Sequence, residues 1–385
     1  MQSFYIKTKI IIERDLSEAV LGILKDEASR AVLVFVDEHV QNHPAVKNLM
    51  NKIMESERKS ELRPLPSGEP TTALVNEHTQ MYKDWGCDML IAIGGGSVID
   101  FVKALSGMLI YKDKVEKYQV NSIPYMEAVK KIAVSTTAGT GAEISKVGVL
   151  INKEINFKRG VVGPGVSPDY AIVCAELSTS VPLKVTAACG MDAMAHAMEA
   201  YVSKIATEIS KMYSKEAFVR LYHNLPLVTE DLDNLNLREE MLLGSALAGG
   251  AINNANTGAC HGMSYAPGVY FGVPHAVAIS VFFVESILLN IEKGCTRGYA
   301  ELYEAIGFSR SGDDHKDALA FVEVMRAYPP LVKYCGSLFD YGITGKDMAF
   351  LAEKAMGNTA AFVTNPVDIS PEDGVRIYRK ALNMD

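Results

Sequence analysis

Short apolar runs alternate with longer mixed segments in the first half of the chain. Three runs rich in β-branched residues span Ala31 to Asp37, Met89 to Ile93 and Lys131 to Ser135. Each run ends at a polar or glycine-bearing turn. Strands without polar alternation have no solvent-facing side, so they belong in a parallel sheet that helices cover on both faces. The pattern predicts an α/β unit of the nucleotide-binding kind.

The second half of the chain has a different character. Long stretches such as residues 187–201 and 241–254 contain no β-rich run and are predicted to be helices. The change follows the segment 177–182 (LSTSVP). We therefore predict a Rossmann-like α/β dinucleotide-binding domain over residues 1–180 and an all-α domain over residues 181–385, with the active site in the cleft between them.

Composition and charge narrow the class of protein. The 385 residues are 48% hydrophobic and 22% charged, which suits a soluble globular protein. The 38 basic residues face 46 acidic ones, for a net charge of −8, and without a basic cluster nucleic acid is not expected as a partner. The apolar run at residues 10–12 is too short for a signal-peptide core, and no longer stretch suggests a membrane span. We predict a cytoplasmic protein without a membrane partner.

A glycine-rich turn follows the second predicted strand. Met89 to Ile93 leads into Gly94-Gly95-Gly96-Ser97, and a helix is predicted over Phe101 to Leu109. Glycines let the backbone approach a pyrophosphate, and the N-terminus of a helix favours negative charge. A glycine triplet without the GxGxxG spacing is also typical of a tight turn, so its place after an apolar strand carries the interpretation.

A threonine-rich loop follows the third predicted strand. This loop supplies three hydroxyl groups, those of Thr136, Thr137 and Thr140. The carboxyl ends of parallel strands share one edge of a sheet, where cofactors bind. The two loops together predict a cofactor site at that edge.

Charged residues in this half add to the cofactor prediction. Asp37 ends the first predicted strand, where a carboxylate can bind ribose hydroxyls and repel a 2′-phosphate, favouring NAD over NADP. A turn aspartate is the alternative interpretation. Lys103 and Lys158 could each balance phosphate charge, although an isolated lysine is more often solvated.

The predicted helix over residues 187–201 carries a candidate metal site. Asp192 and His196 are four residues apart, so they share one helix face. Their neighbours are alanine and methionine, which leaves a buried carboxylate in need of a partner. The partner could be His196 itself, in a hydrogen-bonded pair within a core. Alternatively, a bound cation could satisfy the carboxylate.

Two more histidines stand in similar apolar, small-residue segments. His261 follows Cys260, and His275 follows Pro274. With Asp192 and His196 they form a set of three imidazoles and one carboxylate, which suits Fe²⁺ or Zn²⁺. Catalytic zinc usually has three protein ligands, so four favour iron.

These motifs together resemble the iron-containing (group III) alcohol dehydrogenase family. The family's GGGSxxDxxK loop is similar to Gly94 to Lys103, its TTxGTxxE loop to Thr136 to Glu143, and its helical Asp-x3-His to Asp192 to Tyr201. The later HG and PH elements fall at His261 and His275. The resemblance covers most of the chain.

The family resemblance implies roles for individual residues. It implies the metal ligands Asp192, His196, His261 and His275. It also implies NAD(H)-binding residues, namely Asp37, Gly94, Gly95, Gly96, Ser97, Asp100, Thr136, Thr137, Thr140 and Lys158. Many members carry a proton-relaying histidine four residues after the third ligand, where this chain has Tyr265. Homodimers are common in the family.

The sequence therefore predicts a metal-dependent, NAD-linked enzyme that interconverts a small primary alcohol and its aldehyde by hydride transfer. Two alternatives stay open. One is a lyase similar to dehydroquinate synthase, which uses NAD only transiently. The other is a structural protein that binds NAD without turnover.

Overall fold

The computed structural model describes residues 3–334, 336–357 and 361–382. The chain divides into two compact units. The first consists of Ile6–Pro182 and Asp233–Ala246, and the second of the described residues of Met1–Tyr5, Leu183–Leu232 and Leu247–Asp385. Helix α9 (Leu235–Ala255) begins in the first unit and ends in the second. The predicted boundary at residue 180 lies close to the end of the first segment at Pro182, but a single boundary does not account for the return of Asp233–Ala246 to the first unit.

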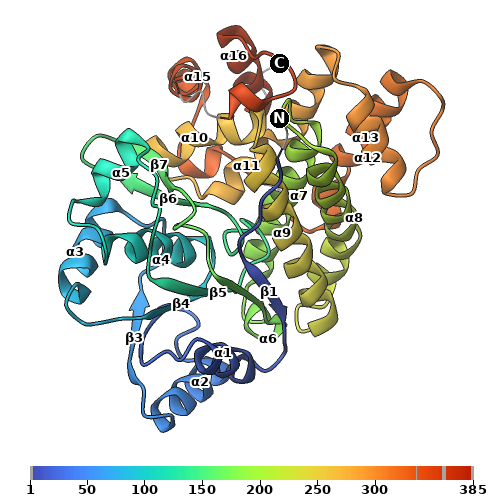
Figure 1. Ribbon diagram of the computed structural model, residues 1–385. Helices are drawn as coiled ribbons and strands as arrows, with labels where there is room; N and C mark the ends of the chain where they lie inside the picture. The colour runs from blue at the N-terminus through green and yellow to red at the C-terminus, as the bar shows by residue number, and fades with distance from the viewer. Residues whose placement is uncertain (1–2, 335, 358–360, 383–385) are drawn as a thin grey trace. The chain divides into compact units, whose positions relative to one another are not determined.

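The first unit has the predicted α/β character (Figure 1). Its strands are β1 (Lys9–Ile12), β2 (Ala31–Asp37), β3 (Lys59–Leu65), β4 (Met89–Gly94), β5 (Lys130–Ser135), β6 (Val147–Asn152), β7 (Phe157–Val162) and β8 (Tyr170–Val173). Its helices are α1 (Leu16–Asp26), α2 (Pro44–Glu55), α3 (Thr72–Tyr82), α4 (Gly96–Met108), α5 (Val115–Asn121) and α6 (Ala175–Ser178).

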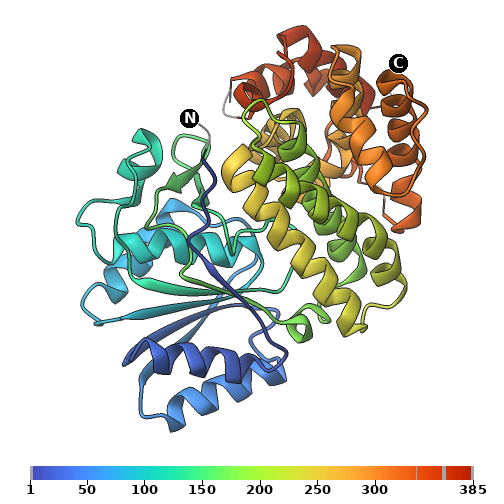
Figure 2. The same ribbon diagram turned by 45° about the vertical axis from the view of Figure 1, so that its right-hand side comes forward.

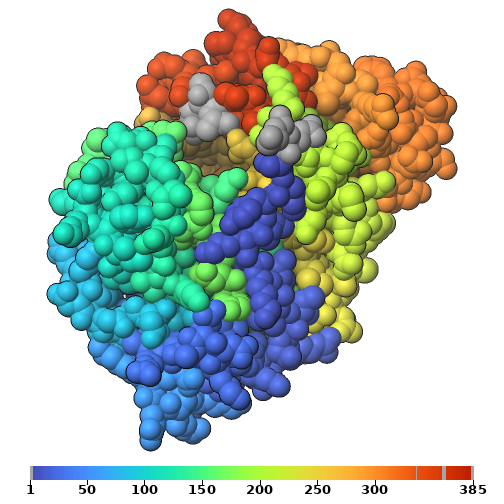
Figure 3. All heavy atoms as spheres, in the orientation of Figure 1, coloured from blue at the N-terminus to red at the C-terminus, as the bar shows by residue number. Residues whose placement is uncertain are grey.

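Six strands of the described chain form one parallel sheet in the order β1-β8-β5-β4-β2-β3. Helices α1 and α2 cover one face, and α3 and α4 cover the other (Figure 2). Figure 3 shows α1 and α2, in blue, at the surface of the unit. The all-parallel sheet with two covered faces is confirmed.

Strand β2 explains how the unit has a core on each face of the sheet. Leu33 and Phe35 point to the α3 and α4 side, while Val32, Val34 and Val36 pack against α1 and α2. All five are fully buried. A strand buried on both faces needs no polar alternation, which is why its apolar run was recognisable in the sequence.

Other strands gave weaker sequence signals. The edge strand β3 is polar (KSELRPL), and β1 and β8 are only four residues long. Strands β6 and β7 form a separate antiparallel hairpin that the sequence did not predict. Helix α4 begins at Gly96, inside the glycine triplet, five residues earlier than predicted.

The second unit is all-helical in its described residues, as predicted. After the part of α9 that it shares, its α-helices are α7 (Leu183–Val202), α8 (Glu208–Glu230), α10 (Ala259–Phe271), α11 (His275–Glu292), α12 (Arg297–Ala305), α13 (Asp314–Arg326), α14 (Tyr328–Leu331), α15 (Met348–Met356) and α16 (Pro371–Ala381). Short 3-10 turns are η1 (Phe339–Tyr341), η2 (Gly345–Asp347) and η3 (Phe362–Thr364).

Helix α11 corrects one sequence expectation. Its 18 residues, His275–Glu292, are long and apolar enough to cross a membrane by length and composition, although no such stretch was predicted. Half of the helix is buried against α7, α10, α13 and α16. Its apolar character is that of a central helix in a helical core.

Candidate metal centre and cofactor loops

Helix α7 supplies the first two candidate ligands. Asp192 and His196 lie one turn apart and are buried, with 1% and 5% of their surface exposed. The small residues around them let neighbouring helices approach closely. At Gly190, for example, an added Cβ would lie 2.4 Å from the side chain of Leu225 on α8.

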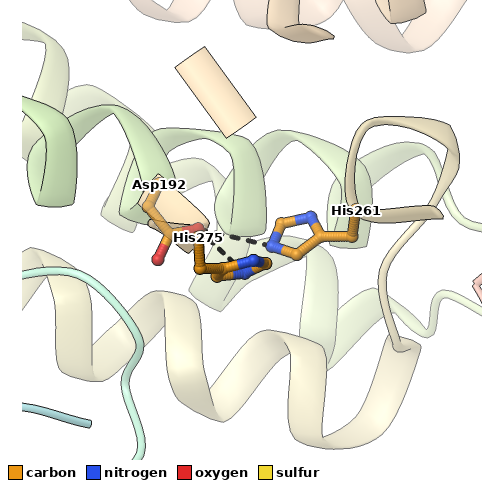
Figure 4. Close-up of side chains that lie close together, drawn as sticks. All are labelled: Asp192, His261 and His275. Carbon is orange, nitrogen blue, oxygen red and sulfur yellow. Dashed lines mark ion pairs between the residues drawn. The ribbon is translucent and has the colours of Figure 1, made fainter. Parts of the chain in front are cut away.

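The starts of two other helices supply His261 and His275. His261 is in the first turn of α10, and His275 is the first residue of α11. Their Nε2 atoms lie 3.4 Å and 3.8 Å from Oδ1 of Asp192 (Figure 4). The candidate ligand atoms of these three residues all lie within 4.8 Å of one another. Residues far apart in sequence thus converge on one carboxylate oxygen.

His196 lies beside this group of three. Its Nε2 is 3.9 Å from Oδ1 of Asp192, and its ring stacks on His261 with 4.3 Å between centroids. The structure therefore brings all four predicted ligands together. The place of His196 as a fourth ligand stays a prediction.

The donor set fits a divalent cation. Oδ1 of Asp192 and Nε2 of His261 are buried and have no hydrogen-bond partner among the described residues. Such unpartnered polar atoms are costly unless something else satisfies them. Ligands about 2.1 Å from one ion are separated by roughly 3.0 to 3.4 Å. The observed nitrogen–oxygen distances of 3.4 to 3.9 Å need little contraction to match.

Glu199 is a site residue that the sequence reasoning missed. Its Oε2 accepts a hydrogen bond from Nδ1 of His261, and its Oε1 accepts one from the backbone N–H of Cys260 at 2.7 Å. Because a carboxylate only accepts hydrogen bonds, Nδ1 carries a proton, and Nε2 is the nitrogen that faces Asp192 and could bind a cation once it is deprotonated. Glu199 follows Asp192 by seven residues, so the helical period contained the signal.

Two side chains cap the N-terminus of α10. Asn365 accepts from the N–H of Ala259 at 3.0 Å, and Glu199 accepts from the next N–H. The N-cap residue, Gly258, makes this approach feasible, because an added Cβ would lie 2.8 Å from Asn365 and 3.1 Å from Glu199. The cap fixes the backbone that carries His261.

The electrostatics of the centre favour positive charge. Burial would raise the pKa of Asp192, but His196, His275 and His261 outweigh burial and hold that pKa well below its usual range. Burial would lower the pKa of His261, but Glu199 and Asp192 outweigh it and raise the pKa to about 9. The two carboxylates therefore attract a proton or a metal cation to the imidazoles.

The two cofactor loops of the first unit lie against each other. Gly94 ends β4, and its carbonyl accepts from the N–H of Thr136 at 3.0 Å. An added Cβ would lie 3.1 Å from Thr137 at Gly95 and 2.7 Å from Thr140 at Gly96. Only glycine permits this packing without displacement of the threonine loop.

The glycine loop ends in an open helix terminus. Gly95 is the N-cap of α4, and it has no side chain to cap the first N–H groups. Ser97 is half-buried in that first turn, and Asp37 lies at the end of β2 next to Gly94. Uncapped N–H groups at a helix N-terminus are suited to a phosphate. The predicted cofactor residues of both loops are thus brought to one edge of the sheet.

Three other charged residues are already engaged within the protein. Both oxygens of Asp100 have partners, Nζ of Lys103 at 3.5 Å and the N–H of Val149 at 3.0 Å. Lys158 lies on β7 of the hairpin, and its Nζ contacts Glu69 at 2.5 Å. Roles for Asp100 and Lys158 toward a cofactor stay predictions. Lys103 is fully buried, so its suggested pairing with a phosphate is wrong.

The chain carries two features that define a class of enzyme. One unit has a parallel sheet with nucleotide-type loops, and the other has a site of three histidines around a buried carboxylate. Metal-dependent dehydrogenases contain both.

Comparisons with known proteins specify the family. Residues 7–175 match the model of the iron-containing alcohol dehydrogenases, and residues 186–382 match the C-terminal model of the Fe-containing alcohol dehydrogenase family. The chain belongs to the iron-containing alcohol dehydrogenase family, and it is an oxidoreductase of that type.

Individual relatives agree with this assignment. The NAD-dependent methanol dehydrogenase of Bacillus methanolicus is 27% identical over 99% of this chain and 100% of its own. The probable alcohol dehydrogenase EutG of Escherichia coli (strain K12) is 32% identical over 83% of this chain and 79% of its own. A crystal structure of 1,3-propanediol oxidoreductase matches with a TM-score of 0.93 at 25% identity, covering 99% of this chain and 100% of that one. The lyase and structural alternatives are therefore not favoured.

Proposed function

We propose that this protein is a metal-dependent, NAD(H)-linked oxidoreductase that interconverts a small primary alcohol and its aldehyde. The observation that carries the proposal is the pair of buried atoms that make no hydrogen bond, Oδ1 of Asp192 and Nε2 of His261, beside two further imidazoles. The family assignment supports the alcohol and aldehyde chemistry.

The residues of the centre have separate tasks in this proposal. Asp192, His261 and His275, with His196, hold the cation, and Glu199 orients His261. The bound groups supply Lewis-acid polarisation of the substrate oxygen and a hydride from the reduced nicotinamide. Asp192 and His196 are nearly fully buried, which limits the access of water to these two side chains.

Iron is the metal that we propose. Three nitrogen ligands and one oxygen suit Fe²⁺ and Zn²⁺ alike, but four protein ligands fill the usual coordination of zinc. Fe²⁺ accepts more than four ligands, so these four residues could hold it while it supplied Lewis-acid chemistry.

NAD(H) is the cofactor that we propose, in preference to NADP(H). Asp37 lies at the carboxyl end of β2 beside the glycine loop, where its charge disfavours a 2′-phosphate. The relative from Bacillus methanolicus is named as NAD-dependent. Asp37→Ser is expected to narrow the preference for NADH over NADPH, measured as the ratio of the two kcat/KM values.

Tyr265 is the proton relay that we propose. It lies on α10 four residues after His261, hence on the same helix face, and it is half-buried. A phenol there can pass a proton to or from the substrate oxygen. If Tyr265→Phe leaves kcat and its pH profile unchanged, this role is excluded.

We also propose a cytoplasmic homodimer. Strand β1 is at one edge of the sheet, with Ile10 and Ile12 exposed by 37% and 53%. An edge strand with exposed apolar side chains is suited to pairing with the same strand of a second copy. Light scattering after gel filtration should give twice the chain mass, and Ile12→Lys should give a monomer.

The test of the proposed activity is NADH oxidation with a panel of short aldehydes, on anaerobically purified protein with its metal content measured. Iron or zinc near one per chain and turnover with at least one aldehyde would support the proposal. Metal without turnover on any aldehyde would favour a non-redox use of NAD. Neither metal nor turnover would overturn the proposal.

A further inference from the structure

Asn365 is a buried amide to which the proposed chemistry assigns no task. It follows η3 directly, and 1% of its surface is exposed. Its Oδ1 accepts a hydrogen bond from the N–H of Ala259 at 3.0 Å, in the first turn of α10. His261 is two residues further along that turn. The amide therefore binds the backbone that carries a proposed metal ligand.

Both ends of the Asn365 amide have partners that fix its orientation. A peptide N–H only donates, so it is the oxygen that faces Ala259. Nδ2 donates to the carbonyl of Val367 at 2.9 Å and to Oδ1 of Asn290 at 2.9 Å. Asn290 is buried as well, and its own Nδ2 donates to the hydroxyl of Tyr299 at 2.8 Å. Rotation of the amide would leave several buried polar groups unpaired, so the orientation is fixed.

Two residues of η3 contact the chain on both sides of His261. Before it in the sequence, the carbonyl of Thr257 accepts from Oγ of Thr364 at 2.7 Å. After it, the ring of Phe362 packs on Gly262, where an added Cβ would lie 2.5 Å from the ring. The start of α10 is thus held at three points by one short segment that is about a hundred residues away in sequence.

The amide pair also joins the two helices that supply histidines to the centre from their first turns. Asn365 binds the start of α10, and Asn290 is on α11, which begins at His275. Glu199 on α7 accepts from the next N–H of α10 and from the ring of His261. Since Glu199 holds the ring and Asn365 holds the backbone, the position of Nε2 of His261 depends on both.

We propose that Asn365, oriented by Asn290, is a positioning residue that holds the first turn of α10 and so sets the affinity of the centre for its metal. The inference rests on the metal-dependent function proposed above. The amide of Asn365 is bonded to protein groups at both ends, so it acts through the backbone and not as a ligand. A looser turn keeps the four ligands but lets His261 occupy a wider range of positions, and a cation then binds less tightly.

The first test measures the Kd for Zn²⁺ by competition with a chelator, with the Tm of the metal-free protein measured alongside. Asn365→Ala leaves the N–H of Ala259 without its acceptor, and we expect the Kd to rise about tenfold. The control is Ser370→Ala, which removes a side-chain cap from α16 in the same unit. Because α16 carries no ligand, this variant should lower the Tm and leave the Kd within a factor of two of wild type.

The second test uses the amide pair and leaves the cap itself in place. Asn290→Ala removes the acceptor that orients Asn365, so the Kd for Zn²⁺ should rise about threefold to fivefold. The double variant should bind Zn²⁺ no more weakly than Asn365→Ala alone, because Asn290 acts through Asn365. Two independent losses of stability would instead have additive effects on the Kd.

Three results would overturn the inference. Wild-type affinity for Zn²⁺ in folded Asn365→Ala and Asn290→Ala would show that the amide pair only stabilises the fold. An equal rise of the Kd in Ser370→Ala would show that any loss of stability in the unit weakens metal binding. Wild-type protein that binds neither Zn²⁺ nor Fe²⁺ would remove the metal-dependent function itself, which the first two results leave intact.

Discussion

The two candidate binding regions are built in opposite ways. The cofactor loops of the first unit consist of glycine, threonine and a helix N-terminus, where the absence of side chains at Gly94, Gly95 and Gly96 permits close packing. The metal centre of the second unit consists of buried charged groups, Asp192 and Glu199, facing imidazoles. The loops depend on the lack of a Cβ at the three glycines, whereas the metal centre depends on the charges of its carboxylates.

This difference determines which kind of substitution should impair binding at each region. Adding a methyl group should damage the loops by displacing backbone, whereas the metal centre should be damaged by removing a charge or a lone pair. The predictions below use variants that act on one region and leave the other intact, from the largest expected effect to the smallest.

The largest effect is expected from removal of a ligand of the metal centre. His261→Ala should lower metal content to a trace and reduce turnover about 10³-fold or more, because Lewis-acid stabilisation is worth several kcal/mol. Elemental analysis and NADH oxidation measure both. The exposed His223 on α8 gives the control, His223→Ala, which should keep metal and activity. Full activity in His261→Ala would show that the reaction does not require this metal centre.

Glu143 is a buried carboxyl in the first unit, and its pKa is shifted in the opposite direction to that of Asp192. Burial raises the pKa of Glu143 to about 7, with Lys103 opposing the shift and Asp100 adding to it, whereas the histidines lower that of Asp192. A raised carboxyl pKa stabilises the fold at low pH, and this contribution is lost as pH rises from 4.5 through 7. Relative to Glu143→Gln, the wild type should lose on the order of 3 kcal/mol of unfolding free energy across that window.

Denaturant unfolding of both proteins between pH 4.5 and 8 measures this difference. The two stability profiles should meet at low pH and diverge as pH rises. Parallel profiles would mean that Glu143 titrates alike in the folded and unfolded chains.

The orienting carboxylate of the metal centre should have an intermediate effect. Glu199→Gln keeps the size of the side chain but weakens its hold on His261, and such partners typically contribute 10- to 100-fold to metal affinity. Competition with a chelator measures the affinity. The control is Glu301→Gln, which removes a carboxylate that accepts from Tyr201 in the same unit. Equal affinities in the two variants would exclude the orienting role.

The smallest effect is expected at the glycine loop. Gly96→Ala places a Cβ 2.7 Å from Thr140, so the threonine loop must shift, at roughly 1 to 2 kcal/mol, or about tenfold in the Kd for NADH. Metal content should not change. Gly22→Ala is the matched control, because its Cβ meets nothing within 4 Å. A loss of metal in Gly96→Ala would contradict the separation of the two regions.

The sequence predicted what local patterns determine. Strand β2 was predicted at its observed bounds because its two-sided burial requires an unbroken apolar run. The order of strand, glycine loop and helix predicted the cofactor edge, and Asp192 with His196 followed from the helical period. Each of these signals lies within about ten residues of sequence.

Features that depend on distant contacts could not be predicted in this way. Glu199 gains its task only because α10 begins beside α7, and Asn365 caps α10 across more than a hundred residues. The burial of Lys103 depends on the β6–β7 hairpin, whose strands gave no clear alternation. Helix α9 begins in the first unit and ends in the second, so no single boundary along the sequence could divide the chain into these two units.

The central claim is that Asp192 and the neighbouring histidines hold a cation required for turnover. The most direct measurement is an anaerobic titration of the chelated protein with Fe²⁺, with NADH oxidation followed at each addition. The account predicts no activity without metal, a rise to a break at one ion per chain, and no such rise in His261→Ala. Full activity in the chelated protein, or a rise that is the same in His261→Ala, would contradict it.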